Sequence, residues 1–161
     1  MPESGPAPDY PGLPERYTLG APARPGDSRM QTLDRFLPPA ILVIEDDRSL
    51  LDVVEQVLAW QGFRVLTATS AKEAHEAEYG YAGPIHLIVS DVHLEGCRGP
   101  EIVRDIRARR DRVAAIYMSG YERDKALAPD ELGPGDGFMH KPFSLRGLQI
   151  QVRNVMDLAV R

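Results

Sequence analysis

Charged side chains stand just past the end of three apolar runs in this chain. They are Glu45 and Asp46 after residues 41–44, Asp91 after residues 87–89, and Lys141 after residues 137–139. In an open parallel sheet, the carboxyl ends of the strands face one crevice where ligands bind, so residues almost a hundred positions apart can share a site. Three carboxylates and one ammonium at such a site indicate a divalent metal ion and a phosphoryl group.

The adjacent acids Glu45 and Asp46 repel each other unless a cation compensates them. Magnesium fits this role because it prefers oxygen ligands and is usually held by one or two carboxylates together with phosphate oxygens. Alternatively, the pair is an ordinary set of acids at a helix N-terminus, where the helix dipole stabilises negative charge. Asp91 favours the metal site, because a carboxylate can act as a nucleophile and form an acyl phosphate.

Two further polar residues follow the fourth and fifth apolar runs. The hydroxyl of Ser119 can donate to a phosphoryl oxygen, and Lys141 is a compact positive charge. Each also has a simpler interpretation, Ser119 as a turn residue beside Gly120 and Lys141 as a solvated lysine. The features together, at the ends of the first, third, fourth and fifth runs, favour one site. The peptide bond between Lys141 and Pro142 can be cis, which the sequence does not decide.

Composition limits the classes of function. The chain has 161 residues, 43% of them hydrophobic, which is enough for one core. With 19 basic and 24 acidic residues, it has no basic patch for nucleic acid or an anionic membrane, and we expect protein partners. The single Cys97 excludes an intrachain disulfide framework, and no apolar run has the length of a membrane span or a signal peptide. We therefore expect a cytoplasmic protein.

The composition changes near residue 38. Nine of the fourteen prolines lie between Pro2 and Pro39, which disfavours helix and sheet, so residues 1–38 are predicted to be a flexible Pro/Gly-rich extension and residues 39–161 the folded domain. Within the extension, Leu33, Phe36 and Leu37 have helical spacing and could dock on the domain. A solvated turn is the interpretation we favour for this segment.

Beyond residue 39, strand patterns alternate with helix patterns, which indicates an α/β sheet. The expected strands are 40–44, 63–67, 86–90, 113–118 and 138–140. The expected helices are 49–60, one capped by Ser70 that ends near Gly80 or Gly83, one that starts at Gly99-Pro100, a short one within 121–128, and one capped by Ser144. Five arginines are expected on a solvated helix face and end: Arg104, Arg107, Arg109, Arg110 and Arg112.

Four segments resemble the motifs of the receiver domains of two-component response regulators, in order and spacing. They are ILVIEDD at 41–47, LIVSDVHL at 87–94, Met118-Ser119-Gly120 and Lys141-Pro142-Phe143. The resemblance covers about residues 39–160. It implies a flavodoxin-like (βα)5 fold, a doubly wound five-stranded parallel sheet with strand order 2-1-3-4-5.

The resemblance also implies roles for the site residues. Asp91 would accept a phosphoryl group from a phosphohistidine of a histidine kinase or histidine phosphotransfer protein, and Ser119 and Lys141 would contact that group. Mg²⁺ would be bound by Asp46, Asp91 and the main-chain carbonyl of His93, with Glu45 acting through water. Phe138, three residues before Lys141, would turn inward when Ser119 moves.

The chain departs from the family pattern at Glu95, where a proline is common, and in its short fourth helix. It is most similar to the C-terminal receivers of hybrid histidine kinases. We expect no output domain after residue 161 and no enzymatic activity beyond the domain's own phosphorylation and dephosphorylation. The alternatives are a degenerate receiver that acts only as an interaction module, and a haloacid-dehalogenase-like phosphohydrolase. A phosphohydrolase of that class would have a second acid two residues after the nucleophile, where this chain has His93, which disfavours it.

Overall fold

The computed structural model describes residues 37–159, and a five-stranded parallel sheet forms its centre. The strands are β1 (Ala40–Ile44), β2 (Arg64–Ala68), β3 (Ile85–Asp91), β6 (Ala114–Ser119) and β7 (Gly137–His140). Their order is β2-β1-β3-β6-β7, and all four pairings are parallel. Counted along the chain, this is the predicted order 2-1-3-4-5.

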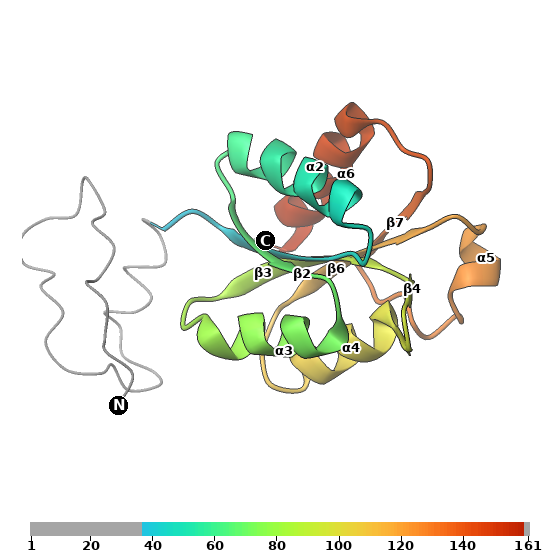
Figure 1. Cartoon of the computed structure of the whole chain (residues 1–161), viewed down its shortest axis with the longest axis horizontal. Coiled ribbons are helices and arrows are strands. Elements are labelled where there is room, and N and C mark those ends of the chain that lie inside the picture. Colours follow the sequence, from blue (N-terminus) through green and yellow to red (C-terminus); the bar gives the residue numbers. More distant parts are fainter. Residues whose placement is uncertain (1–36, 160–161) are drawn as a thin grey trace, which may run out of the picture.

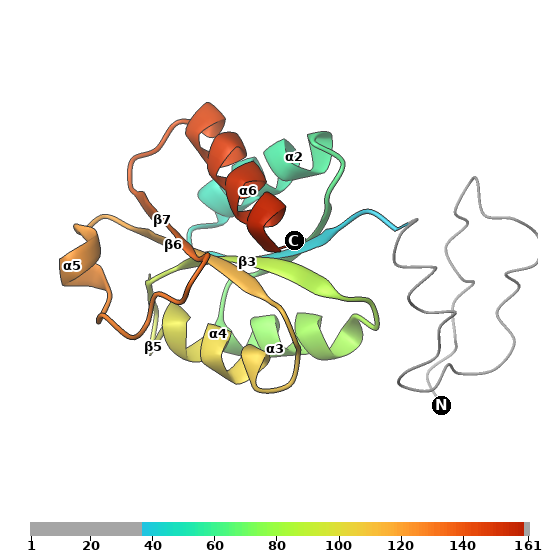
Figure 2. The same ribbon diagram turned by 180° about the vertical axis from the view of Figure 1, so that it is seen from behind.

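Helices cover both faces of the sheet (Figure 1). The first face carries α2 (Arg48–Trp60) and α6 (Leu145–Ala159), and the second carries α3 (Ala71–Gly80) and α4 (Gly99–Arg107). The short α5 (Arg123–Ala126) lies beyond the carboxyl end of β6, as the reverse view also shows (Figure 2). The doubly wound fold is therefore confirmed. None of the helices in the described range is both long and apolar enough to span a membrane.

The alternation of side chains along β1 divides the core into two clusters. Ile41 and Val43 pack in the cluster under α2 and α6, whereas Leu42 and Ile44 pack in the cluster under α3 and α4. All five residues of β1 are buried, because helices cover both faces of the strand. The continuous apolar run in the sequence reflects the position of β1 inside the sheet, between β2 and β3.

Side chains cap the starts of two helices, and a glycine follows the end of one. The sequence pattern predicted the roles of Ser70 and Gly62, but it placed the start of α2 at Ser49 and did not predict Asp47 as the cap. Asp47 caps α2 by accepting hydrogen bonds from the amides of Ser49 (2.9 Å) and Leu50 (3.2 Å). Ser70 caps α3, and its hydroxyl accepts a hydrogen bond from the amide of Glu73 at 3.2 Å. Gly62, with a φ of 91°, takes the left-handed conformation after α2 that favours glycine.

One element was not predicted. After Asp91, the chain forms a small antiparallel hairpin of β4 (His93–Leu94) and β5 (Cys97–Arg98), with Gly96 at a φ of 77° in its turn. Strands of two residues have no periodicity to detect in the sequence. The hairpin matters for the site, because it connects Asp91 directly to the start of α4.

The prediction of a solvated arginine face is wrong for Arg107 and Arg110, which are half-buried and paired, whereas Arg109 is exposed as predicted but also forms an ion pair. Arg109 and Arg110 donate hydrogen bonds to the buried carboxylate of Glu78, and Arg107 pairs with Asp136. Arg110 also donates to the carbonyl oxygens of residues 78, 81 and 83, so it holds the end of α3. These charges are paired across elements, which the sequence pattern of α4 alone does not reveal.

The N-terminal extension stays a prediction. Its residues 1–36, including Leu33 and Phe36, lie outside the described residues, as do residues 160–161. The division of the chain at residue 38 is therefore not tested.

Candidate functional site at the carboxyl edge of the sheet

The two adjacent acids after β1 lie in different environments. Glu45 is 1% exposed, and its Oε1 accepts a hydrogen bond from the amide of Asp47 at 3.1 Å. Asp46 is exposed, and within residues 37–159 its carboxylate takes part in no hydrogen bond or ion pair. Asp46 is therefore free to bind a ligand from solvent, whereas Glu45 is fixed by the protein.

Asp91 is the last residue of β3 and is 8% exposed. Its Oδ1 accepts a hydrogen bond from the amide of His93 at 3.2 Å. Its backbone is approached closely by Gly99, where a Cβ atom would lie 2.1 Å from the carbonyl oxygen of Asp91 and 2.5 Å from Ser90 Oγ. Only glycine fits there. The sequence pattern marked Gly99 as a helix start but did not indicate this contact.

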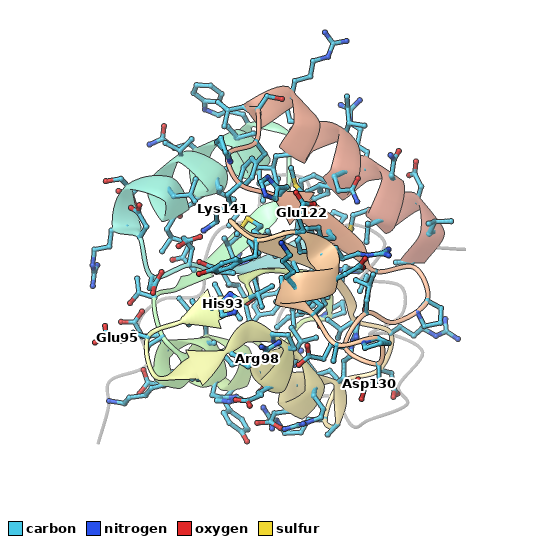
Figure 3. All side chains as sticks on the ribbon, turned by 90° about the vertical axis from the view of Figure 1, so that its right-hand side faces the viewer. His93, Glu95, Arg98, Glu122, Asp130 and Lys141 are labelled. Atoms are coloured by element: carbon cyan, nitrogen blue, oxygen red, sulfur yellow. The ribbon has the colours of Figure 1, made fainter. Side chains whose placement is uncertain are left out.

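Lys141 joins the two buried acids. Its Nζ donates hydrogen bonds to Glu45 Oε2 at 2.7 Å and to Asp91 Oδ2 at 2.9 Å. Its amide donates to the carbonyl oxygen of Ser119 at 2.7 Å, and its peptide bond to Pro142 is cis. The interpretation of Lys141 as a solvated lysine is therefore wrong. Figure 3 looks onto this edge of the molecule, with Lys141 and His93 labelled.

Burial and pairing act in opposite directions on the charges of this site. Burial raises the pKa of Glu45 above its ordinary value of 4.5, although the hydrogen bonds from Lys141 and from the Asp47 amide partly offset this. Burial alone would lower the pKa of Lys141, but its hydrogen bonds to Glu45 and Asp91 outweigh burial and raise it above 10.5. Lys141 is thus a permanent positive charge at the site.

The acidic cluster has the composition of a site for a hard divalent cation. One carboxylate oxygen from each of Glu45, Asp46 and Asp91 lies within 4.8 Å of the others. These are oxygen donors, and Asp46 is open to solvent, as suits an ion that keeps several waters. The four histidines do not contribute a further metal-binding cluster among residues 37–159.

Ser119 follows Met118, which pairs with Asp91 across β3 and β6, and within residues 37–159 its hydroxyl makes no hydrogen bond to the clustered carboxylates. Ser119 is 1% exposed, and its hydroxyl accepts a hydrogen bond from the amide of Tyr121 at 3.1 Å. Phe138 is half-buried, pairs with Tyr117 across β6 and β7, and packs against the cluster under α3 and α4. Burial raises the pKa of Tyr117 to about 12. The sequence pattern did not single out Tyr117.

Two aromatic rings stand at the rim of the site. The rings of His93 and Tyr121 are edge-to-face with their centroids 5.5 Å apart. His93 is two residues after Asp91, and Tyr121 is two residues after Ser119. Both side chains are exposed, so the pair partly borders the approach to Asp91.

Two arginines that follow Asp91 hold the segment between β6 and β7. Arg98 Nη2 donates hydrogen bonds to the carbonyl oxygen of Ala126 at 3.0 Å and to Glu131 Oε2 at 2.7 Å. Arg107 donates two hydrogen bonds to the carboxylate of Asp136, at 2.5 and 3.1 Å. These contacts connect the hairpin after Asp91 to the segment that contains α5. Sequence reasoning missed them, because the partners are about 30 residues apart and have no shared spacing.

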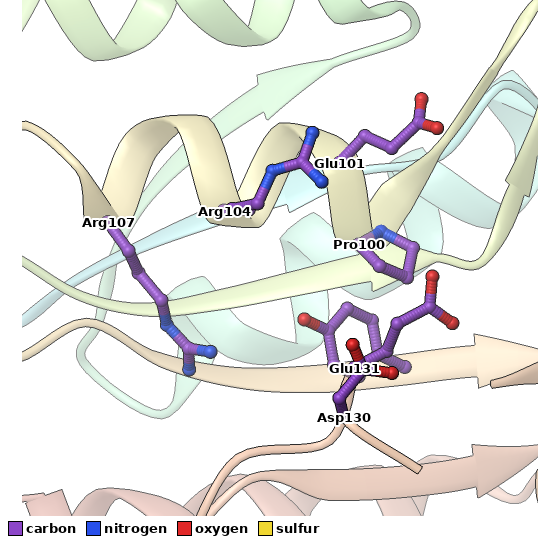
Figure 4. Close-up of a pocket in the computed structure, with 7 residues that line it drawn as sticks. Pro100, Glu101, Arg104, Arg107, Asp130 and Glu131 are labelled. Atoms are coloured by element: carbon purple, nitrogen blue, oxygen red, sulfur yellow. The ribbon is translucent and has the colours of Figure 1, made fainter. Parts of the chain in front are cut away.

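A cavity of about 220 Å³ lies between α4 and the segment that joins β6 to β7 (Figure 4). It is lined by Pro100, Glu101, Arg104, Arg107, Tyr117, Asp130 and Glu131. None of the three clustered acids lines the cavity, so it is separate from the candidate metal site.

Comparisons with known proteins agree with this geometry. A family model described as the response regulator receiver domain matches residues 41–153. The sensor kinase CckA of Brucella abortus (strain 2308) is 29% identical over 117 residues, which are 73% of this chain and 12% of the kinase. The aerobic respiration control protein ArcA of Escherichia coli (strain K12) is 31% identical over 121 residues, which are 74% of this chain and 49% of ArcA. The chain thus spans half or less of these relatives.

Solved structures give the same result. The receiver domain from the hybrid histidine kinase CckA matches with a TM-score of 0.61 and 28% identity, over 73% of this chain and 98% of that domain. A CheY-like receiver domain protein from Methanospirillum hungatei JF-1 has a TM-score of 0.66 over 76% of this chain and 96% of its own. At 22% identity, the second match supports the fold alone.

Proposed function

The chain belongs to the response regulator receiver domain family of two-component signalling, and on this premise we propose that Asp91 accepts the phosphoryl group. The observation that carries the proposal is the pairing of Lys141 Nζ with Asp91 Oδ2 at 2.9 Å, beside the exposed carboxylate of Asp46. A nucleophile, a fixed cation and a free acid thus meet at the carboxyl edge of the sheet. The donor is a phosphohistidine of a histidine kinase or histidine phosphotransfer protein.

The transfer uses groups already in place. A carboxylate oxygen of Asp91 forms the new bond to phosphorus as the bond between phosphorus and the donor imidazole nitrogen breaks, and that electron pair returns to the ring. Lys141 balances the charge on the phosphoryl oxygens, and the hydroxyl of Ser119 donates to one of them. Glu45 keeps Lys141 in position through its 2.7 Å hydrogen bond.

The acidic cluster holds Mg²⁺ in this proposal. Asp46, Asp91 and the main-chain carbonyl of His93 would hold the ion, and Glu45 would act through water. The bound ion supplies positive charge that stabilises the phosphoryl oxygens during transfer. The support is the fit of the oxygen donors, three carboxylates within 4.8 Å with one of them open to solvent.

The signal leaves the site through the segment between β6 and β7. A phosphoryl group adds about two negative charges, which draw the Ser119 hydroxyl away from the Tyr121 amide. Phe138 then turns toward the space behind Ser119. Arg98 offers a second connection, because it is the last residue of the hairpin after Asp91 and donates hydrogen bonds to both Ala126 and Glu131.

The domain acts as a cytoplasmic signalling module that contacts proteins, not nucleic acid or membrane, and has no activity beyond its own phosphorylation and dephosphorylation. The net charge of −5 supports protein partners. The alternative of a degenerate receiver is not favoured, because the acids, Ser119 and Lys141 are all present.

The test is incubation of the full chain with acetyl phosphate, with and without Mg²⁺, followed by intact mass measurement. We expect one added phosphoryl group on the wild type in the presence of Mg²⁺ and none on Asp91→Asn. The matched control is Asp52→Asn, which removes an exposed acid on α2 and should label like the wild type. Equal labelling of Asp91→Asn would refute the assignment.

A further inference from the structure

An apolar stripe lies exposed on the outer side of α2. Val53 is 42% exposed and Trp60 is 85% exposed, and their separation of seven positions amounts to about two helical turns, so both lie on one face. Trp60 is the chain's single tryptophan. Scattered exposed apolar residues are common, but a tryptophan with most of its surface in water is a strong indication of a missing contact.

The chain that precedes the domain enters beside this stripe. The amide of Arg64 donates a hydrogen bond to the carbonyl oxygen of Pro39 at 3.0 Å, and Arg64 pairs with Ala40. Trp60 is only four residues before Arg64, and the turn through Gly62 connects them. The start of β1 and the end of α2 accordingly lie at the same end of the molecule (Figures 1 and 2).

The sequence just before this entry point contains three large apolar residues. Leu33, Phe36 and Leu37 are spaced three and one residues apart, a spacing that predicts a shared side in a helical turn. Pro38 and Pro39 follow and end any such turn. The receiver function does not use these side chains.

The tether is long enough for this segment to reach α2. Phe36 is three residues from Pro39 and can extend about 10 Å from it, and Leu33 can extend about 20 Å. The distance along the chain from Arg64 back to Trp60 is at most about 14 Å, and the turn shortens it. Because the segment is tethered, its effective concentration at α2 is on the order of millimolar, so a weak contact is sufficient.

The sequence alone favours a solvated turn for this segment, but the exposed side chains beside the entry point favour the alternative. We propose that residues 33–37 dock on the outer face of α2 and cover Val53 and Trp60. The occupant is this chain's own segment, held by its apolar side chains. A protein that binds this face of α2 must first displace it.

The test uses the full chain and the fluorescence of Trp60 under selective excitation, with acrylamide as the quencher. In the wild type, the quenching constant should be about half that of the double variant Leu33→Ser/Phe36→Ser, because docking covers a ring that is otherwise 85% exposed. The emission of the variant should also move to longer wavelength. The control Leu13→Ser/Leu19→Ser, in the same extension, should match the wild type.

Two results would overturn the proposal. If Trp60 is quenched equally in the wild type and in Leu33→Ser/Phe36→Ser, at an unprotected level, the face is free in the isolated chain and a partner protein is its occupant. If both proteins are protected and the protection is lost on dilution, a second copy of the chain covers the face.

Discussion

Replacement of Lys141 by methionine should destabilise the domain by leaving two acids without their shared cation. Methionine keeps most of the side-chain length, so the change mainly removes the charge that bonds Glu45 at 2.7 Å and Asp91 at 2.9 Å. Removal of one partner of a buried ion pair costs about 3–5 kcal/mol. The Lys141 side chain is 24% exposed, which favours the lower end, so we expect a loss of about 3 kcal/mol near neutral pH.

The loss should depend on pH in a direction set by Glu45. Burial already raises the pKa of Glu45 above 4.5, and removal of Lys141 raises it further. A carboxyl group whose pKa is higher in the folded state than in the unfolded state favours folding when it is protonated. Its stability contribution is fully present below the unfolded-state pKa, and it is lost as the pH rises through the folded-state pKa. The stability gap between Lys141→Met and the wild type should therefore be small below pH 4.5 and grow as the pH rises.

Urea unfolding followed by circular dichroism, at about pH 4.5 and near neutral pH, measures this gap. Mg²⁺ should narrow it at neutral pH, because the ion supplies positive charge to the same acids. The matched control is Lys125→Met, which removes an exposed lysine and should change stability by less than about 0.5 kcal/mol. An equal loss at both pH values would mean that packing, not charge, accounts for the role of Lys141, and no loss at all would refute the electrostatic reasoning.

Three further predictions concern the metal, the switch and the α3–α4 contact. Asp46→Ala should weaken Mg²⁺ binding about tenfold or more, as measured by calorimetry. The stability of the metal-free domain should stay the same or rise slightly, since this acid has no hydrogen bond or ion pair within residues 37–159, and a marked loss of metal-free stability would contradict this. Beryllofluoride should shift the amide resonances of residues 119–145 far more than those of β2 and α3. Phe138→Ala should abolish the shifts that lie far from Asp91, while phosphorylation of Asp91 persists; finding the largest shifts in β2 and α3 would reject this switch. Arg110→Ala should lower the free energy of unfolding by about 3 kcal/mol at neutral pH and by less in acid. Burial raises the pKa of Glu78, but its arginine hydrogen bonds outweigh burial and lower that pKa, so the stability from the pair is present above pH 4.5 and lost as the pH falls. A loss of stability that is independent of pH in urea titrations would exclude this origin.

Most of the fold could be predicted because its elements are marked by local patterns. The continuous apolar run of β1 indicates a strand covered on both faces, and Ser70 marks the start of α3 where it is observed. Strand ends were less exact. The amide of Phe63 bonds to the carbonyl oxygen of Leu58 in the turn after α2, so β2 starts at Arg64, one residue later than predicted.

The sequence predicted which charged side chains meet at this edge of the sheet, but it did not predict their contacts. The positions of Glu45, Asp46, Asp91 and Lys141 past strand ends are sufficient to bring them to one edge of a parallel sheet. The sequence could not show that Glu45 is buried while Asp46 is exposed, because the two are adjacent and chemically alike.

Contacts between distant elements could not be predicted in the same way. Arg107 has the spacing of a solvated helix residue, yet it pairs with Asp136, 29 positions away. Gly99 is needed because the backbone of Asp91 passes next to it, a constraint that exists only after the hairpin has formed. Such contacts depend on the tertiary arrangement, and local sequence patterns carry no signal for them.

The position of the phosphoryl group is the most direct test of the central claim. Borohydride reduces an acyl phosphate to an alcohol, so treatment of the phosphorylated full chain converts the modified aspartate to homoserine, which peptide mass spectrometry can locate. We expect homoserine at position 91 alone, formed only in samples that received both the phosphodonor and Mg²⁺. Homoserine at another aspartate, such as Asp46, or a stable phosphate on Ser119 with Asp91 unchanged, would contradict the account.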